Sequence, residues 1–133
     1  MLTLFEELTA NLNDFERDVV MPIIVRCFEK KAQLGLVGEV NSVKNTAIRN
    51  GVNATLLKMG HDYKLSDVKL RKTMGAVRKL SLVHGICSST HGYYIAANDE
   101  ELMACIESLK QRVSNQMMVI NALEKQLNQK NVA

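Results

Sequence analysis

Residues 98–133 carry a heptad repeat of apolar side chains, and this repeat limits the folds that the chain can adopt. It follows Asn98-Asp99-Glu100-Glu101, where Asn98 is suited to cap a helix and Glu101 to complete a capping box. All of the eight a and d positions except Gln116 are apolar; the eight are Leu102, Ile106, Leu109, Val113, Gln116, Ile120, Leu123 and Leu127. The repeat predicts a long C-terminal helix over residues 98–133, following a separate domain of residues 1–97.

The side chains of this seam predict self-association. β-Branched residues dominate the a positions and leucine the d positions, a pattern that favours a parallel two-stranded coiled coil. The seam therefore predicts a homodimer in which Gln116, the one polar member, sets the register. Two alternatives stay open. The helix could lie against its own domain, and the apolar residues 117–119 leave room for a bundle.

Composition places the chain among small globular proteins. It has 133 residues, 47% hydrophobic, with one proline. The longest apolar run, residues 19–25, is too short to span a membrane, and Glu6 and Glu7 interrupt any signal peptide. The three cysteines are widely spaced, which argues against a disulfide framework or a zinc site. We therefore expect a cytoplasmic protein with reduced thiols and no membrane association.

The first 65 residues predict three helices. Asn13 or Asp14 is placed to cap the second helix, which would run to about residue 33 with a kink or break at Pro22. Asn41 or Ser42 could cap a third helix, ended by the turn signal at residues 50–51. A short first helix is indicated by apolar residues at helical spacing: Leu2, Phe5, Leu8 and Leu12.

A basic helix follows. Ser66 is suited to cap a helix over residues 67–80, whose inward face would hold Leu70, Met74 and Val77. Gly75 costs about 1 kcal/mol against alanine inside a helix, so close packing on another helix or on DNA should compensate for it. The opposite face is mostly basic and comprises Val68, Arg71, Lys72, Gly75, Arg78 and Lys79.

Positive charge is concentrated around this helix. Residues 58–80 hold seven basic and two acidic side chains, whereas residues 1–57 and 81–133 each carry a net charge of −1. Such focused charge is typical of a protein that binds a polyanion. The alternative is a solvated lysine-rich helix face.

A β-hairpin is predicted next, with strands at residues 82–87 and 93–96. The polar residues 88–92 form the loop between them. The expected fold class is therefore mainly α with a small β-hairpin and a long C-terminal helix.

Two stretches resemble small phage-type winged helix-turn-helix DNA-binding proteins. Residues 63–72 resemble the start of the recognition helix, and residues 91–96 with 100–109 resemble the wing and C-terminal helix. The resemblance implies a winged helix-turn-helix domain at residues 1–97, with residues 66–80 in the major groove of double-stranded DNA. It also implies a role in transcription regulation or in mobile-element replication.

In such a complex Arg71 and Lys72 would meet base edges, and Arg78 and Lys79 would meet phosphates. The hairpin could donate hydrogen bonds to phosphates, or simply form a soluble loop. The predicted DNA-contacting residues are Lys64, Ser66, Val68, Lys69, Arg71, Lys72, Gly75, Arg78, Lys79, Ser88, Ser89, Thr90 and His91.

No motif for catalysis accompanies these features. His61, His84 and His91 lack metal-ligand spacing, and no Gly-rich phosphate loop or nucleophile elbow occurs. We expect no enzyme activity, no metal and no cofactor. Two alternatives to DNA binding remain: a protein-interaction module whose basic helix meets an acidic partner, and a structural coiled-coil assembly protein.

Overall fold

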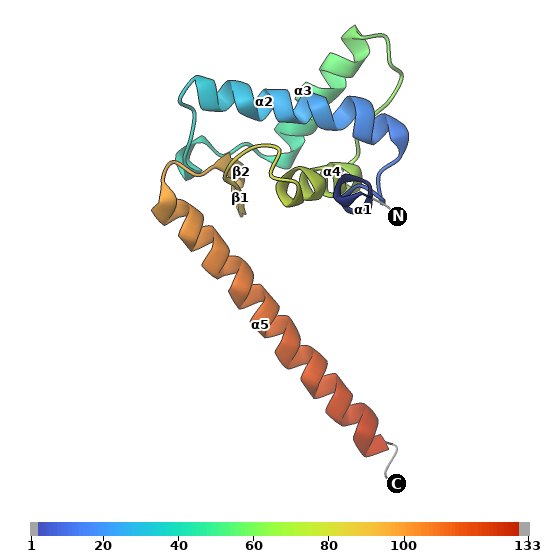
Figure 1. The fold of residues 1–133 in the computed structure, drawn as a ribbon, viewed down its shortest axis with the longest axis vertical. Helices are drawn as coiled ribbons and strands as arrows, with labels where there is room; N and C mark the ends of the chain where they lie inside the picture. The colour runs from blue at the N-terminus through green and yellow to red at the C-terminus, as the bar shows by residue number, and fades with distance from the viewer. Residues whose placement is uncertain (1–2, 131–133) are drawn as a thin grey trace. The chain divides into compact units, whose positions relative to one another are not determined.

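A computed structural model describes residues 3–130, which are mainly helical with one small antiparallel hairpin (Figure 1). This confirms the predicted fold class at that level. The chain divides into two units, residues 1–98 and residues 99–133. The first unit contains α1 (Leu4–Leu8), a π-helical turn η1 (Glu16–Val20), α2 (Met21–Gln33), a 3-10 turn η2 (Glu39–Asn41), α3 (Asn45–Lys58), α4 (Asp67–Lys79), β1 (Ile86–Ser89) and β2 (Gly92–Ile95).

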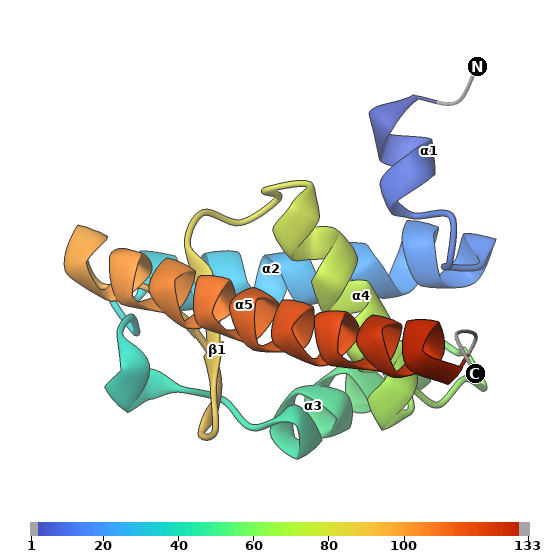
Figure 2. The same cartoon turned by 90° about the horizontal axis from the view of Figure 1, so that it is seen from below.

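Helices α2, α3 and α4 pack on one another and form the core of the first unit (Figures 1 and 2). The predicted inward face of α4 is confirmed, since Leu70, Met74 and Val77 are all buried. Aliphatic side chains dominate the core, which includes Val20, Ile24, Phe28, Val52, Leu56, Leu70, Met74, Val77, Ile86 and Ile95.

The first helix is shorter than its apolar spacing predicts. Thr3 caps α1 and forms a capping box with Glu6, but the helix ends at Leu8. Leu12 lies beyond it, buried in the turn that leads to the next helix. Leu2 falls outside the described residues.

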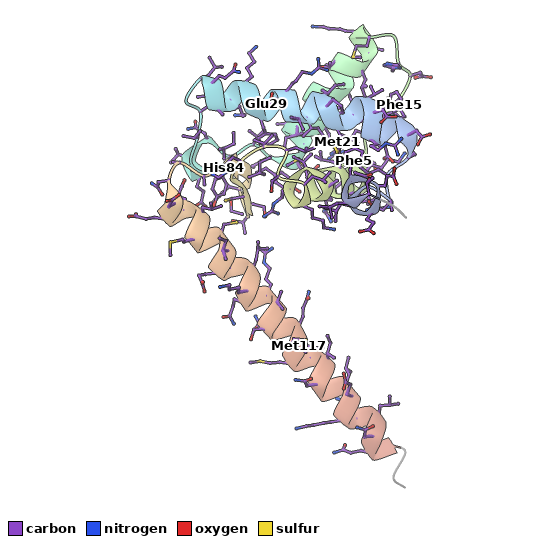
Figure 3. All side chains as sticks on the ribbon, in the orientation of Figure 1. Phe5, Phe15, Met21, Glu29, His84 and Met117 are labelled. Atoms are coloured by element: carbon purple, nitrogen blue, oxygen red, sulfur yellow. The ribbon has the colours of Figure 1, made fainter. Side chains whose placement is uncertain are left out.

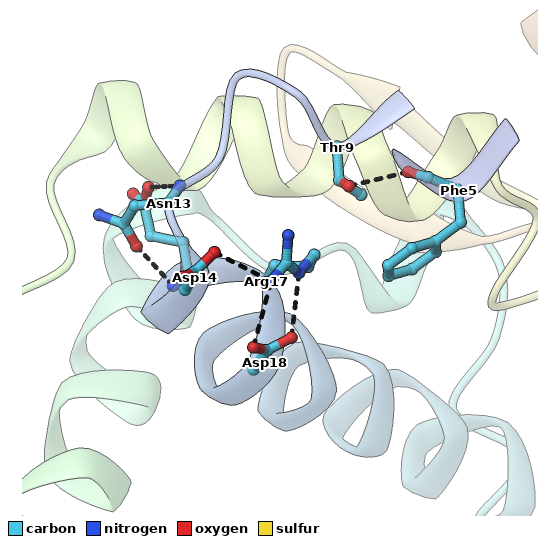
Figure 4. Close-up of polar contacts among 7 residues, drawn as sticks. Phe5, Thr9, Asn13, Asp14, Arg17 and Asp18 are labelled. Carbon is cyan, nitrogen blue, oxygen red and sulfur yellow. Dashed lines mark hydrogen bonds and ion pairs between the residues drawn. The ribbon is translucent and has the colours of Figure 1, made fainter. Parts of the chain in front are cut away.

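The second helix begins as predicted at Asn13. The side chain of Asn13 accepts a hydrogen bond from the Glu16 amide at 2.7 Å, and Glu16 accepts one from the Asn13 amide at 3.0 Å. Arg17 lies between Asp14 and Asp18, with contacts of 3.0 Å to each (Figure 4). The two hydrogen bonds satisfy backbone amides at the start of the helix, and the acidic side chains stabilise its positive end.

Proline at position 22 does not break this helix. The chain is helical from residue 14 to residue 33, and the turn before Pro22 is π-helical, with the Met21 amide bonded to the Glu16 carbonyl. A proline has no N–H and its ring crowds the preceding turn. The wider π turn makes room for that ring, so the helix continues.

The predicted bounds of the third helix are wrong. Lys44, rather than Asn41 or Ser42, is the N-cap residue of α3, and the helix passes through Asn50-Gly51 to Lys58. Burial of Ile48, Val52 and Leu56 on one face outweighs the local turn signal. Gly60, two residues beyond the end of the helix, has a φ of +84° that allows the hydrogen bond from the His61 amide to the Leu56 carbonyl.

The hairpin is shifted from its predicted position. Ser88 and Ser89 belong to β1 and pair with Tyr93 and Gly92, so the turn contains only Thr90 and His91. Residues 82–85, predicted as strand, form the loop after α4.

A third segment of chain joins the hairpin. Val43, just before α3, exchanges two backbone hydrogen bonds with Tyr93, at 2.8 and 2.9 Å. Figure 2 shows the hairpin as a narrow ribbon beside the segment that leads into α3. Gly92 is needed for this approach, because its φ is +118° and a Cβ atom there would lie 2.2 Å from the Val43 carbonyl oxygen.

The second unit is a single helix, α5 (Asp99–Lys130). It contains all eight predicted seam residues, as the heptad repeat requires. None of the helices over residues 3–130 is long and apolar enough to cross a membrane.

Candidate nucleic-acid interface

The exposed face of α4 carries most of the predicted DNA-contacting residues. Ser66 caps the helix by accepting a hydrogen bond from the Lys69 amide at 3.2 Å, as predicted. Arg71, Lys72 and Lys79 are exposed, Arg78 is half-buried, and Val68 is 59% exposed. The helix therefore presents a basic face with one apolar side chain to solvent.

Gly75 lies at the middle of this face. A Cβ atom built on Gly75 would meet no heavy atom within 4 Å. Close packing on another described helix therefore does not explain a glycine in the helix interior. The position leaves the α4 backbone accessible between Arg71 and Arg78.

Arg71 is held by its own helix. Its guanidinium forms an ion pair with the Asp67 carboxylate one turn earlier, at 2.6 Å, with both side chains partly exposed. Ion pairs between residues one turn apart stabilise a helix by at most about 0.5 kcal/mol. Arg71 can therefore exchange Asp67 for a stronger acceptor at little cost.

The hairpin lies against the same side of α4. The Arg78 guanidinium donates to the Ser88 hydroxyl at 3.5 Å. Burial raises the pKa of Tyr93, and the positive charges of Arg78 and Arg71 act in the opposite direction. Tyr93 and Arg71 line the same hollow.

An open hollow lies where α3, α4 and the hairpin meet. Its polar and charged lining consists of Lys44, Asn45, Thr46, Asp67, Arg71, Ser88, Ser89, Thr90, Gly92 and Tyr93. Three of the four predicted hairpin residues, Ser88, Ser89 and Thr90, thus share a hollow with Arg71.

Helix α3 and its N-cap residue also line this hollow, which was not predicted from the sequence. Lys44 is exposed and makes no side-chain capping hydrogen bond, so the first amides of α3 keep their donor capacity. A helix N-terminus carries partial positive charge and favours anions. No local sequence pattern could have identified Lys44. Its place beside the hairpin depends on the Val43–Tyr93 bridge, which is a long-range pairing.

Other predicted residues lie elsewhere. His91, at the hairpin turn, lines a neighbouring hollow with Glu39, Val40, Ser42 and Lys44. Lys64 is exposed in the segment before α4. Lys69 is about 200° around the helix from Arg71, and its ammonium lies 5.0 Å from the centroid of the Tyr63 ring.

Metal-binding geometry is not found in the part of the chain that the structure describes. No three histidine, cysteine or acidic side chains over residues 3–130 are grouped as a metal site would need. Cys27, Cys87 and Cys105, all within the described residues, form no disulfide.

Comparisons with protein-family models, curated proteins and solved structures give no match to this chain.

Proposed function

We propose that the first unit is a winged helix-turn-helix domain that binds double-stranded DNA, with α4 in the major groove. The order of elements supports this proposal: a helix, a short bridge strand at Val43, two helices and a hairpin. In this fold α3 and α4 are the helix-turn-helix pair, and β1–β2 is the wing.

The observation that carries the proposal is the solvent-facing side of α4. It combines four basic residues, Arg71, Lys72, Arg78 and Lys79, with Gly75, where an added Cβ atom would meet nothing within 4 Å. Positive charge favours contact with the phosphates, and a position without a side chain lets the helix backbone come closer to the bases.

Each side chain has a distinct role in this complex. Arg71 leaves Asp67 and pairs with the two acceptors of a guanine, which suit its planar fork. Val68 contacts the methyl group of a thymine. Arg78, Lys44 and the first amides of α3 bind phosphates, which contribute affinity but little sequence preference.

The test is fluorescence anisotropy with random duplexes of about 30 base pairs across a salt series, since phosphate contacts make affinity fall as salt rises. Wild-type protein is expected to bind at low salt and to lose affinity steeply. Arg71→Ala with Lys72→Ala is expected to abolish binding and to keep the fold.

Lys30→Ala with Lys31→Ala is the matched control. It removes the same charge from the last turn of α2, outside the α4 face. Equal losses in both double variants would mean that net charge alone drives binding. Absence of wild-type binding even at low salt would contradict the proposal and favour an acidic protein partner.

A role in transcription or mobile-element replication extends this proposal and depends on the target site. Selection of bound duplexes from a random pool tests it. A defined motif supports a regulator, and no enrichment contradicts sequence-specific regulation.

A further inference from the structure

The strongest unexplained surface is the seam of α5. Six of its apolar residues are between 40% and 61% exposed: Ile106, Leu109, Val113, Ile120, Leu123 and Leu127. Figure 3 shows side chains, Met117 among them, projecting along the whole helix. Helices in proteins are stabilised mainly by packing of an apolar face, so a helix of 32 residues with this stripe is expected to have a partner.

We propose that the partner is the α5 helix of a second copy of this chain, in a parallel, in-register coiled coil. The repeat supports this occupant, because a strict heptad spacing over the full helix matches another helix with the same spacing. At 1.5 Å per residue the helix is about 48 Å long, enough for all eight seam positions to pair.

Gln116 determines the orientation. In a parallel pair each d position faces the same d position, so the two Gln116 amides meet and each can donate to and accept from the other. In every antiparallel register a d position faces an a position. All a positions here are aliphatic, so Gln116 would lose its partner, for example against Val113.

Charges beside the seam do not oppose this arrangement. In the parallel register the flanking g and e positions pair Cys105 with Lys110, Arg112 with Met117, and Val119 with Glu124. None of these pairs brings like charges together.

The first experiment measures the mass of the full-length chain by sedimentation equilibrium over a concentration series, without DNA. A two-chain species is expected. A monomer at every concentration, or a trimer or tetramer, would overturn the proposal. Because DNA is absent, this result is independent of the DNA-binding proposal.

Paired charge variants locate the interface. Val113→Glu with Ile120→Glu places carboxylates in the seam and is expected to give monomers. Ser114→Glu with Asn121→Glu adds the same charges on the adjacent outer face and is expected to leave the dimer intact. Dimers of equal affinity in both variants would contradict the seam assignment.

Crosslinking tests the orientation separately. In a chain with Cys27→Ser and Cys105→Ser, Gln116→Cys alone is expected to form a disulfide-linked dimer under mild oxidation. The antiparallel alternative predicts no crosslink with Gln116→Cys alone. It predicts instead a crosslink between one chain carrying Gln116→Cys and another carrying Val113→Cys.

Discussion

The hydroxyl of Tyr63 donates a hydrogen bond to the Glu16 carboxylate at 3.1 Å, joining residues 47 positions apart. Glu16 is 5% exposed and also accepts the Asn13 amide. The Tyr63 ring packs on Phe15, with 4.8 Å between ring centroids. This contact ties the segment before α4 to the start of the second helix, and so helps to fix where α4 begins.

Tyr63→Phe is expected to destabilise the first unit by about 1–2 kcal/mol, because it leaves a buried carboxylate without one hydrogen-bond donor. Urea unfolding followed by circular dichroism measures this loss. Glu16→Gln and the double variant complete a cycle that isolates the pair. Additive losses in the cycle would show that the two side chains do not interact.

The same contact predicts a stability change at high pH. Burial, followed by the hydrogen bond to Glu16, raises the pKa of Tyr63 to about 12. The folded state therefore favours the protonated phenol relative to the unfolded chain, whose tyrosines titrate near 10. This stabilisation is present below about pH 10 and is lost as the pH rises through about 12.

Urea midpoints of the wild-type protein and Tyr63→Phe, measured from neutral to strongly alkaline pH, test this sign. The advantage of the wild-type protein should shrink over that interval. An advantage that stays constant at every pH would mean that Tyr63 does not titrate with a raised pKa.

Gly92→Ala is expected to cost about 2–4 kcal/mol, because the methyl group would collide with the Val43 carbonyl and the φ of +118° is strained for alanine. The matched control is Gly51→Ala inside α3, where a Cβ atom meets nothing within 4 Å. That control should stabilise the protein by about 1 kcal/mol. Similar effects of both substitutions on urea unfolding would argue against the close approach of Val43.

Gly75→Ala separates stability from the proposed function. It should stabilise the fold by about 1 kcal/mol, since α4 has open space there. It should nevertheless weaken DNA binding, by up to about tenfold or 1.4 kcal/mol, because the methyl group keeps the backbone from the bases. Gly51→Ala gives the same stabilisation outside the α4 face. If both alanine variants bind DNA like the wild type, close backbone approach at Gly75 is not needed.

Local sequence patterns predicted correctly those helices for which the capping residue and the apolar spacing indicate the same bounds. The cap at Ser66 and the helical spacing of Leu70, Met74 and Val77 predicted α4 correctly. Asn13 likewise predicted the start of the second helix. The heptad repeat likewise predicted one continuous C-terminal helix. In these segments the short-range hydrogen bonds and the apolar period favour the same structure.

The sequence by itself determined the helices with a clear cap and period, and with them the basic face of α4. Only the tertiary structure decided that α3 continues through Gly51, that Val43 pairs with Tyr93, and that Lys44 shares a hollow with Arg71. The physical reason is distance along the chain. Core burial and backbone pairing between remote segments outweighed a local turn signal of about 1 kcal/mol, and no short-range pattern contains those contacts.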